Sequence, residues 1–134
     1  MKTARPIVLA LFFLAAAACA TPTRDQNAPS VTSSSLSPRL AAAGLARVDD
    51  PRMVCMVNDQ YMGKEQIPVV VGAKTYFGCC AMCKEKLRRN SAVRTAIDPF
   101  SGRVVDKAVA IIVRNDEGKV LYFESEDTLK SYLQ

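Results

Sequence analysis

The chain contains no histidine and no tryptophan among its 134 residues. Without histidine, a His-based catalytic triad, a His-ligated metal enzyme and a histidine pH switch are all excluded. An excess of one charge is also missing, because 18 basic residues face 13 acidic ones and the formal net charge is only +5. The chain is comparatively well supplied with sulfur, in five cysteines and five methionines.

The first residues of the chain predict export. Lys2 and Arg5 form a short positive region, an apolar run follows to residue 18, and Cys19 comes directly after the alanines that end this run. The run is too short for a membrane-spanning helix, which needs roughly 20 apolar residues, so residues 1–18 are predicted to be a signal peptide. We expect a lipoprotein signal with Cys19 as the lipidated N-terminus, and ordinary cleavage after Ala20 is the alternative.

The residue after Cys19 indicates which membrane holds the lipoprotein. It is Ala20 rather than aspartate, a pattern that in Gram-negative lipoproteins favours the outer membrane. The expected location is therefore the periplasmic side of the cell envelope, with the protein held by its lipid. Removal of the signal peptide leaves 16 basic against 13 acidic residues, a net charge of +3 that is too mild to argue for nucleic acid as a partner.

The remaining chain is predicted to be a tether followed by one small domain. Residues 19–45 are expected to be flexible, because the first part is rich in Thr, Ser, Pro, Asn and Gln and offers little apolar surface to bury. Residues 40–48 form either a short helix or the end of this tether. Residues 46–134 make the domain, and a domain of this size buries only about 60–65% of its unfolded surface, so a metal or a disulfide would stabilise it appreciably.

The middle of the domain is predicted to be a hairpin followed by a helix. Residues 67–71 and 74–77 are short apolar strands around a Gly-Ala turn. Residues 80–89 have helical spacing, with basic residues near the negative C-terminal end of the helix. Residues 91–97 are expected to be a further helical turn that stops before Pro99, since proline disfavours a helical conformation in the residue before it.

The last third predicts a second hairpin and a final helix. Residues 109–113 and 119–123 are strands joined by the turn-rich segment 115–118. Ser125 can cap the helix that follows, and acidic residues stand in its first turn. The whole therefore predicts a small α+β domain with two hairpins and helices packed on one side.

Four cysteines besides Cys19 carry the chemistry. Cys79, Cys80 and Cys83 lie where the first hairpin passes into a helix, and pairs three or four residues apart share a helix face. Thiolates are stabilised near a helix N-terminus by its dipole and its free amides. Cys55 stands 24 residues before Cys79 and can close the site from the preceding loop.

The ligand types indicate a soft ion. Three thiolates, or two with a methionine thioether, suit Cu(I), while four thiolates can hold Zn(II). The thioethers nearest to the cysteines in sequence are those of Met56 and Met82, and packing in the core is the alternative role for a methionine at such a position.

A longer pattern connects these cysteines to a known family. Cys55 is followed after 23 residues by Cys79 and after three more by Cys83, with Tyr76-Phe77 in the strand before and a basic helix after. The segment from residue 53 to residue 90 thereby resembles the TRASH and YHS group of metal-binding domains. The resemblance implies a treble-clef-like fold and heavy-metal sensing, trafficking or resistance. It also implies Cys55, Cys79 and Cys83 as ligands, with Cys80 as the duplicate.

A second resemblance rests on fewer residues. Cys55-Met56, together with the strand, turn, strand and helix of residues 108–133, is similar to the copper lipoproteins that assist nitrous oxide reductase assembly. Those proteins usually carry Cys-X-Met, whereas here the methionine follows the cysteine directly. Both resemblances imply copper handling.

We therefore expect a non-enzymatic lipoprotein that binds a soft ion and passes it to a periplasmic partner. The expected ion is Cu(I), and Zn(II) is the alternative. Two other interpretations remain open. Four cysteines in an oxidising compartment can form two disulfides, in any of three pairings, and staple a structural docking domain. Cys80 and Cys83 also have the Cys-X-X-Cys spacing of a thiol-disulfide exchange protein, although the chain lacks the βαβ pattern of thioredoxin.

Overall fold

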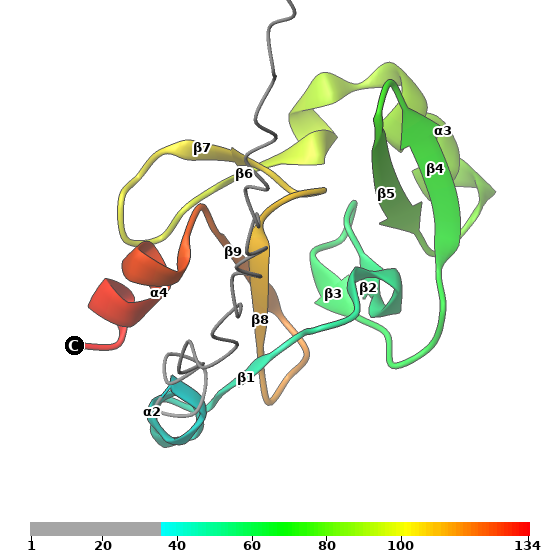
Figure 1. Ribbon diagram of the computed structural model, residues 1–134. Helices are drawn as coiled ribbons and strands as arrows, with labels where there is room; N and C mark the ends of the chain where they lie inside the picture. The colour runs from blue at the N-terminus through cyan, green and yellow to red at the C-terminus, as the bar shows by residue number, and fades with distance from the viewer. Residues whose placement is uncertain (1–35) are drawn as a thin grey trace, which may run out of the picture.

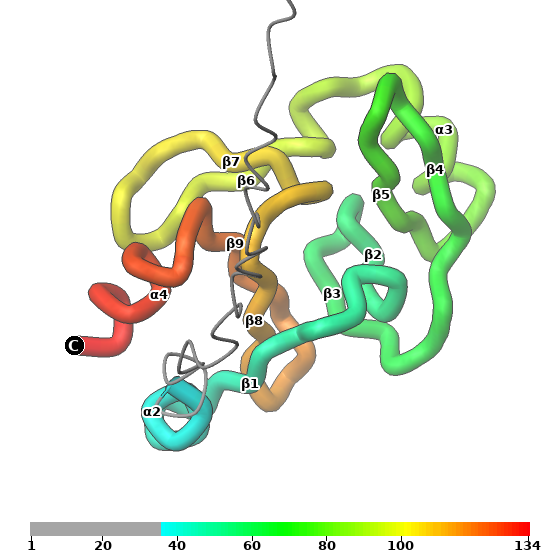
Figure 2. Tube along the Cα trace, viewed as in Figure 1, coloured from blue at the N-terminus to red at the C-terminus, as the bar shows by residue number. Residues whose placement is uncertain are grey.

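The computed structural model describes residues 36–134, shown as a ribbon in Figure 1 and as a chain trace in Figure 2. The predicted signal peptide, Cys19 and residues 20–35 of the predicted tether lie outside this range. The described part is an α+β domain, as predicted, with helices α2 to α4 and only antiparallel strand pairs. None of its helices has the length and apolar character needed to cross a membrane.

A three-stranded sheet forms one half of the domain. Its strands are β1 (Leu45–Arg47), β8 (Ile111–Asn115) and β9 (Val120–Phe123), in the order β1-β8-β9. Helices α2 (Leu36–Ala42) and α4 (Glu126–Tyr132) flank it, on the left of Figure 1. The predicted second hairpin is thus confirmed, and so is the final helix, where Ser125 accepts the backbone N–H of Thr128.

Both faces of the sheet are buried. Side chains alternate along its strands, so neighbouring residues of one strand face different cores. Ile112 and Tyr122, opposite each other in the ladder, face the main core. Val113 and Phe123 face a second core, which they share with Leu129 of α4 and with two leucines of α2. This central ladder therefore joins the two cores.

The cysteine-bearing half consists of short strands and one helix. Strands β2 (Val54–Cys55) and β3 (Gln60–Tyr61) pair with each other, and β4 (Ile67–Val71) pairs with β5 (Lys74–Gly78). Helix α3 (Ala81–Arg89) follows directly and packs on the β4–β5 hairpin. Both the hairpin and the helix agree with the sequence prediction, and β2 and β3 lie between the two halves (Figure 1).

A third hairpin was not foreseen. β6 (Thr95–Ile97) pairs with β7 (Val104–Asp106), where a helical turn over residues 91–97 was expected. Only residues 91–94 are helical, as the 3-10 turn η2 (Ser91–Arg94), and another 3-10 turn, η1 (Pro51–Met53), precedes β2. Residues 95–97 instead complete backbone hydrogen bonds with β7 across the turn of residues 98–103, and strands of three residues are too short for the sequence to show their alternation.

The folded part also starts earlier than predicted. Residues 36–45 were assigned to the tether, with a short helix over residues 40–48 as one of two alternatives at its end. The structure has helix α2 over residues 36–42 and strand β1 over residues 45–47, and Leu36 and Leu40 are buried in the second core. Their spacing of four residues places both on one face of the helix. The apolar contacts with β8, β9 and α4 therefore order a segment whose upstream composition resembles a linker.

One buried carboxylate holds two of these segments together. Asp98 is fully buried in the turn of the β6–β7 hairpin. It accepts the backbone N–H groups of Phe100 and Ser101 within the turn and that of Glu124 before α4, at 2.8, 3.1 and 2.9 Å. Burial opposes ionisation of Asp98, but the N–H of Glu124, the side chain of Thr128 and the two turn amides together outweigh it and lower the pKa. The hairpin is thereby fixed to the end of β9.

We expect Asp98→Ala to lower the free energy of unfolding by about 3 kcal/mol, because it leaves three backbone donors without their acceptor. Urea denaturation followed by circular dichroism measures this. Asp116→Ala is the control: Asp116 is exposed and forms no ion pair within residues 36–134, so its loss should change stability by less than about 0.5 kcal/mol. Equal effects of the two substitutions would contradict the assigned role of Asp98.

Candidate metal centre

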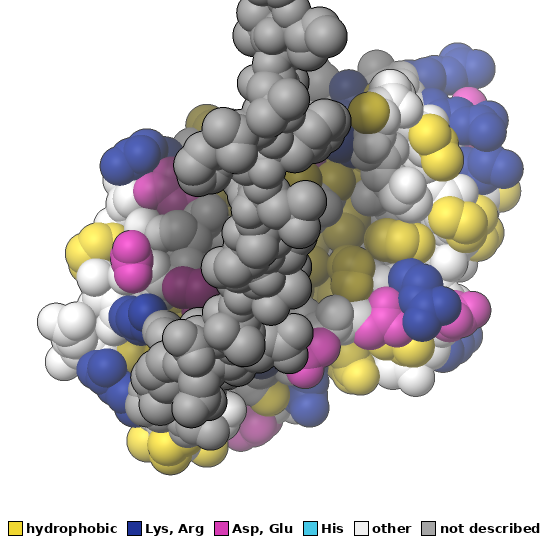
Figure 3. Space-filling view, in the orientation of Figure 1, with side chains coloured by type: hydrophobic (Ala, Val, Ile, Leu, Met, Phe, Trp, Pro, Cys, Tyr) yellow, Lys and Arg dark blue, Asp and Glu magenta, His cyan; other side chains and the backbone are white. Residues whose placement is uncertain are grey.

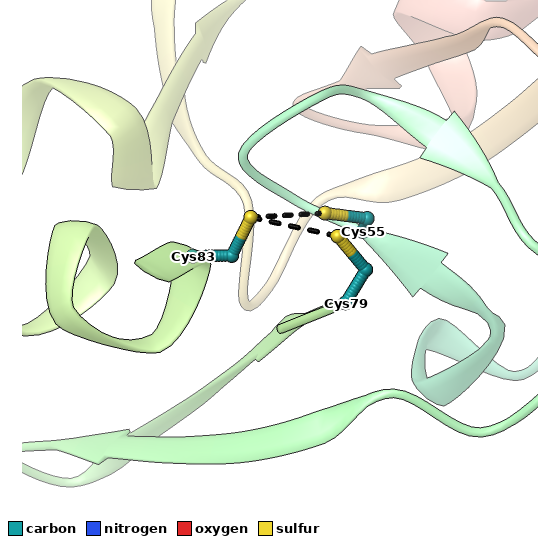
Figure 4. Close-up of side chains that lie close together, drawn as sticks. All are labelled: Cys55, Cys79 and Cys83. Carbon is teal, nitrogen blue, oxygen red and sulfur yellow. Dashed lines mark hydrogen bonds between the residues drawn. The ribbon is translucent and has the colours of Figure 1, made fainter. Parts of the chain in front are cut away.

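Three cysteine sulfurs converge at the junction of β2, β5 and α3 (Figure 4). The Sγ atom of Cys83 lies 3.9 Å from that of Cys55 and 3.5 Å from that of Cys79. All three sulfurs lie within 4.8 Å of one another. In the described part of the chain, no other set of three or more cysteine, histidine or acidic side chains is this close. The three cysteines are therefore close enough to hold a metal ion.

Each sulfur comes from a different element. Cys55 ends β2, Cys79 follows the last residue of β5, and Cys83 lies in the first turn of α3. The backbone N–H of Met56 donates to the carbonyl of Phe77 at 2.9 Å, which holds the end of β2 beside the end of β5. Because α3 starts directly after Cys79 and Cys80, its first turn places Cys83 beside the ends of β2 and β5.

Gly78 permits the close approach of β5 to Cys83. Its backbone is extended, so it is not needed for an unusual φ, but a Cβ atom there would lie 2.9 Å from the Cβ of Cys83 and 3.3 Å from Leu87 Cδ1. Carbon atoms in contact are normally about 3.5–4.0 Å apart. Only glycine therefore lets β5 come this near to α3.

The sulfur separations fit a thiolate-bound ion. A metal–sulfur distance of about 2.3 Å places three sulfurs about 4.0 Å apart when the ion lies in their plane, and somewhat closer when the ion is tetrahedral. Such an ion needs only small movements of the three side chains. Disulfide formation needs a larger change, because bonded sulfurs lie about 2.05 Å apart. All four cysteines among residues 36–134 are free.

Backbone amides favour an anionic sulfur at Cys55. This side chain is fully buried, and burial opposes its ionisation. The backbone N–H groups of Asn58, Cys79 and Val57 outweigh burial, so the pKa of Cys55 is lowered. The side-chain amide of Asn58 also lies 3.8 Å from the sulfur of Cys79. The loop after β2 thus supplies the polar surroundings for a buried thiolate.

The other two thiols of the cluster hold their protons more firmly. Burial, followed by the sulfurs of Cys79 and Cys80, raises the pKa of Cys83 to about 12. The pKa of Cys79 is also raised, first because of its contact with the sulfur of Cys55. The pKa of Cys80 is instead lowered, chiefly by the nearby backbone N–H of Cys83.

The remaining predicted ligands are not members of the three-sulfur cluster. Cys80 is exposed and is not part of the three-sulfur cluster. Met56 is fully buried and belongs to the main hydrophobic core, which agrees with the packing alternative. Met82 is 72% exposed on α3. Cys19 lies outside the described residues.

The sequence analysis missed a buried cation behind the cluster. Lys107 is only 4% exposed, and its ammonium donates to the carbonyl of Met56 at 2.7 Å and to the carboxylate of Asp59. It also lies 5.1 Å from the centre of the Tyr122 ring, within the range of a cation–π interaction. Lys107 thereby fixes the loop that follows Cys55. Its only sequence signal is that Asp106 and Lys107 are the two charged residues in the otherwise apolar stretch 104–113.

Comparison with known proteins assigns no family. No family model matches the chain, and no match was found among curated proteins or among solved structures. A function must therefore be argued from the centre itself.

We expect Gly78→Ala to weaken metal binding at least about tenfold, as loss of a supporting residue commonly does, because the added methyl group pushes Cys83 away from Cys79. Stability should also fall by about 1–3 kcal/mol through overpacking. Metal titration and urea denaturation measure the two effects.

Gly72→Ala is the control, because it should lower stability without changing the positions of the three sulfurs. Gly72 has a φ of 61° and no neighbour within 4 Å of an added Cβ, at the far turn of the same hairpin. Its replacement should lower stability by about 1 kcal/mol through backbone strain alone and leave the metal affinity unchanged. An equal loss of affinity in both variants would show that Gly78 has no special effect on the cluster.

Metal binding should release protons. Because the pKa values of Cys79 and Cys83 are raised, both thiols are protonated near neutral pH, and a metal ion must displace their protons. We expect the binding constant to rise about 100-fold or more for each unit of pH between about pH 6 and 8. Competition titrations at several pH values measure this slope. A rise of tenfold or less would mean that fewer than two protons leave.

Proposed function

We propose that this protein is a non-enzymatic carrier of a soft metal ion, with Cu(I) as the cargo and Cys55, Cys79 and Cys83 as its ligands. The observation that carries the proposal is the convergence of three sulfurs from three separate elements. Structural packing does not require this convergence, since a buried cysteine otherwise behaves as a small apolar residue. Zn(II) is the alternative cargo.

The donor set favours Cu(I). Thiolates are soft ligands that select Cu(I) and zinc, whereas magnesium, calcium and manganese prefer oxygen. Structural zinc sites are almost always four-coordinate, and the cluster offers three sulfurs within 4.8 Å of one another. A three-coordinate thiolate site therefore supports Cu(I) over Zn(II).

The arrangement also supports transfer rather than permanent storage. Cys55 and Cys83 are buried, but Cys79 is only partly covered. An acceptor ligand can bind the ion on the side of Cys79 while one protein thiolate leaves. The ion then moves between proteins without being released into water and without a change of oxidation state.

The sequence resemblances support the same proposal. The TRASH and YHS-like spacing selects Cys55, Cys79 and Cys83, the three residues that the fold brings together. The predicted signal peptide and lipidated Cys19 add an export route and a membrane anchor, which we include in the proposal: a lipoprotein on the periplasmic side of the outer membrane that delivers metal to a periplasmic acceptor.

Thiol-disulfide exchange is the competing function. Its support is the exposed Cys80, whose pKa is lowered chiefly by the nearby N–H of Cys83 within the Cys-X-X-Cys spacing. The raised pKa of its spacing partner Cys83 and the close third sulfur of Cys55 are better explained by a cluster that awaits a cation.

The test is an anaerobic Cu(I) titration of the full chain against bathocuproine disulfonate, preceded by a count of free thiols in the protein isolated from the periplasm. We expect free thiols and one tightly bound Cu(I) per chain. Cys79→Ser or Cys83→Ser should weaken binding by more than about 100-fold, which exceeds the usual effect of losing an outer-sphere residue.

Met82→Leu is the control for thioether ligation, and it should leave the affinity unchanged because the Met82 side chain is largely exposed. Oxidised thiols together with negligible copper affinity would overturn the carrier and favour a disulfide-stapled docking domain. Catalysed reduction of insulin disulfides by a protein that does not bind copper would instead favour the exchange enzyme.

A further inference from the structure

The four cysteines form a path from the interior to the surface. Cys55 is 0% and Cys83 6% exposed, Cys79 is intermediate, and Cys80 is exposed. Cys80 follows Cys79 directly and stands three positions before Cys83 at the start of α3. An acceptor that approaches the cluster along α3 therefore meets the thiol of Cys80 first.

The surface beside Cys80 is basic. Helix α3 carries four basic residues and a single acidic one, Glu85. Glu85 forms ion pairs with Arg88 and Arg89, at 3.4 and 3.2 Å. Lys84 and Lys86 form no ion pair within the described chain, so their charges are not neutralised by neighbours. Figure 3 shows lysine and arginine side chains gathered on this part of the molecule, at its upper right.

The same helix also offers apolar contact. A shallow groove of about 410 Å³ runs along it, lined by Met82, Glu85, Lys86, Arg89 and Asn90. These positions recur every three or four residues and so form one stripe of α3. Met82 and the aliphatic stems of the basic residues supply the apolar area. The stripe lies on the side of α3 away from the buried Cys83 and Leu87, so it borders the cluster without containing it, whereas Lys84, four positions after Cys80, lies on the side of Cys80.

We propose that metal exchange takes place at the start of α3, beside Cys80 and Lys84. A negatively charged acceptor is drawn there by the basic residues of α3, and Cys80 is the thiolate through which the ion passes. This inference rests on the proposed function and assigns its exchange face. The Cys80 thiol gives up its proton and binds the Cu(I) ion as one of the buried thiolates, such as Cys55, releases the ion and takes up a proton. An acceptor sulfur or nitrogen then bonds to the ion as the cluster thiolates leave, and these take up protons from water. Copper remains Cu(I) throughout.

Positive charge near the exchange point raises the encounter rate of an anionic acceptor, by tenfold or more in favourable cases, and salt removes the effect. A small chelator reports this directly. Bathocuproine disulfonate carries negative charge, whereas neocuproine is uncharged, and both change colour when they take Cu(I). Stopped-flow transfer from the loaded full chain to each chelator separates the effect of charge from the effect of the thiol.

We expect Cys80→Ser to change the Cu(I) affinity by less than about threefold, since Cys80 lies outside the cluster, and to slow transfer to both chelators at least about tenfold. Transfer at the rate of the unaltered protein would overturn the role of Cys80. A loss of affinity as large as that in Cys79→Ser would also overturn it, because Cys80 would then be a resident ligand. A full chain that takes up no Cu(I) at all would mark failure of the proposed function instead.

The double variant Lys84→Gln/Lys86→Gln tests the basic face. It should slow transfer to bathocuproine disulfonate several-fold, leave transfer to neocuproine unchanged, and lose its effect above about 0.5 M salt. Lys64→Gln/Lys119→Gln is the matched control, because it removes two exposed lysines that lie outside α3. Equal slowing by the two double variants would show that only net charge acts, and it would overturn α3 as the exchange face.

Discussion

The three-cysteine cluster depends on how closely the end of β5 approaches the first turn of α3. That approach is limited by Gly78, where any side chain would meet Cys83. The strand delivers Cys79, the helix delivers Cys83, and the Met56–Phe77 backbone hydrogen bond brings Cys55 to the same point. None of these contacts involves a cysteine sulfur: Gly78 lies against the Cβ of Cys83, and the hydrogen bond joins backbone atoms. The position of the sulfurs is thus determined by how the backbone packs.

Pre-arranged sulfurs carry an energetic cost that the metal can remove. Two of the three thiols are buried, and a buried thiol resists ionisation. The amides around Cys55 offset part of that cost, while Cys79 and Cys83 keep their protons until a cation replaces them. A cation bound by these groups favours the folded chain, because the unfolded chain lacks the arrangement. Metal binding by these three side chains would therefore be linked to folding.

Local sequence patterns predicted the longer elements, and long-range contacts determined the rest. The β4–β5 hairpin, α3 and the cap at Ser125 follow from spacing and turn residues within a few positions. Strands β2 and β3 have two residues each, too few to show any period. Helix α2 is ordered by contacts with residues more than 70 positions away. Spacing predicted a thiolate site among the four cysteines, and the resemblance to a family selected three of them. The tight contact of Gly78 with Cys83 depends on how the strand packs on the helix, and Lys107 acts through partners about 50 positions away, so no sequence pattern reveals either.

Lys107 has a consequence for transplanting the centre. A peptide cut from residues 53–90 contains every thiol of the cluster, yet the ammonium that fixes the loop after Cys55 comes from the far side of the β6–β7 hairpin. A graft of that peptide into another scaffold would carry the ligands without the support for one of them. A designer who wants this centre must therefore copy the fold as a whole, or rebuild a buried cation behind Met56.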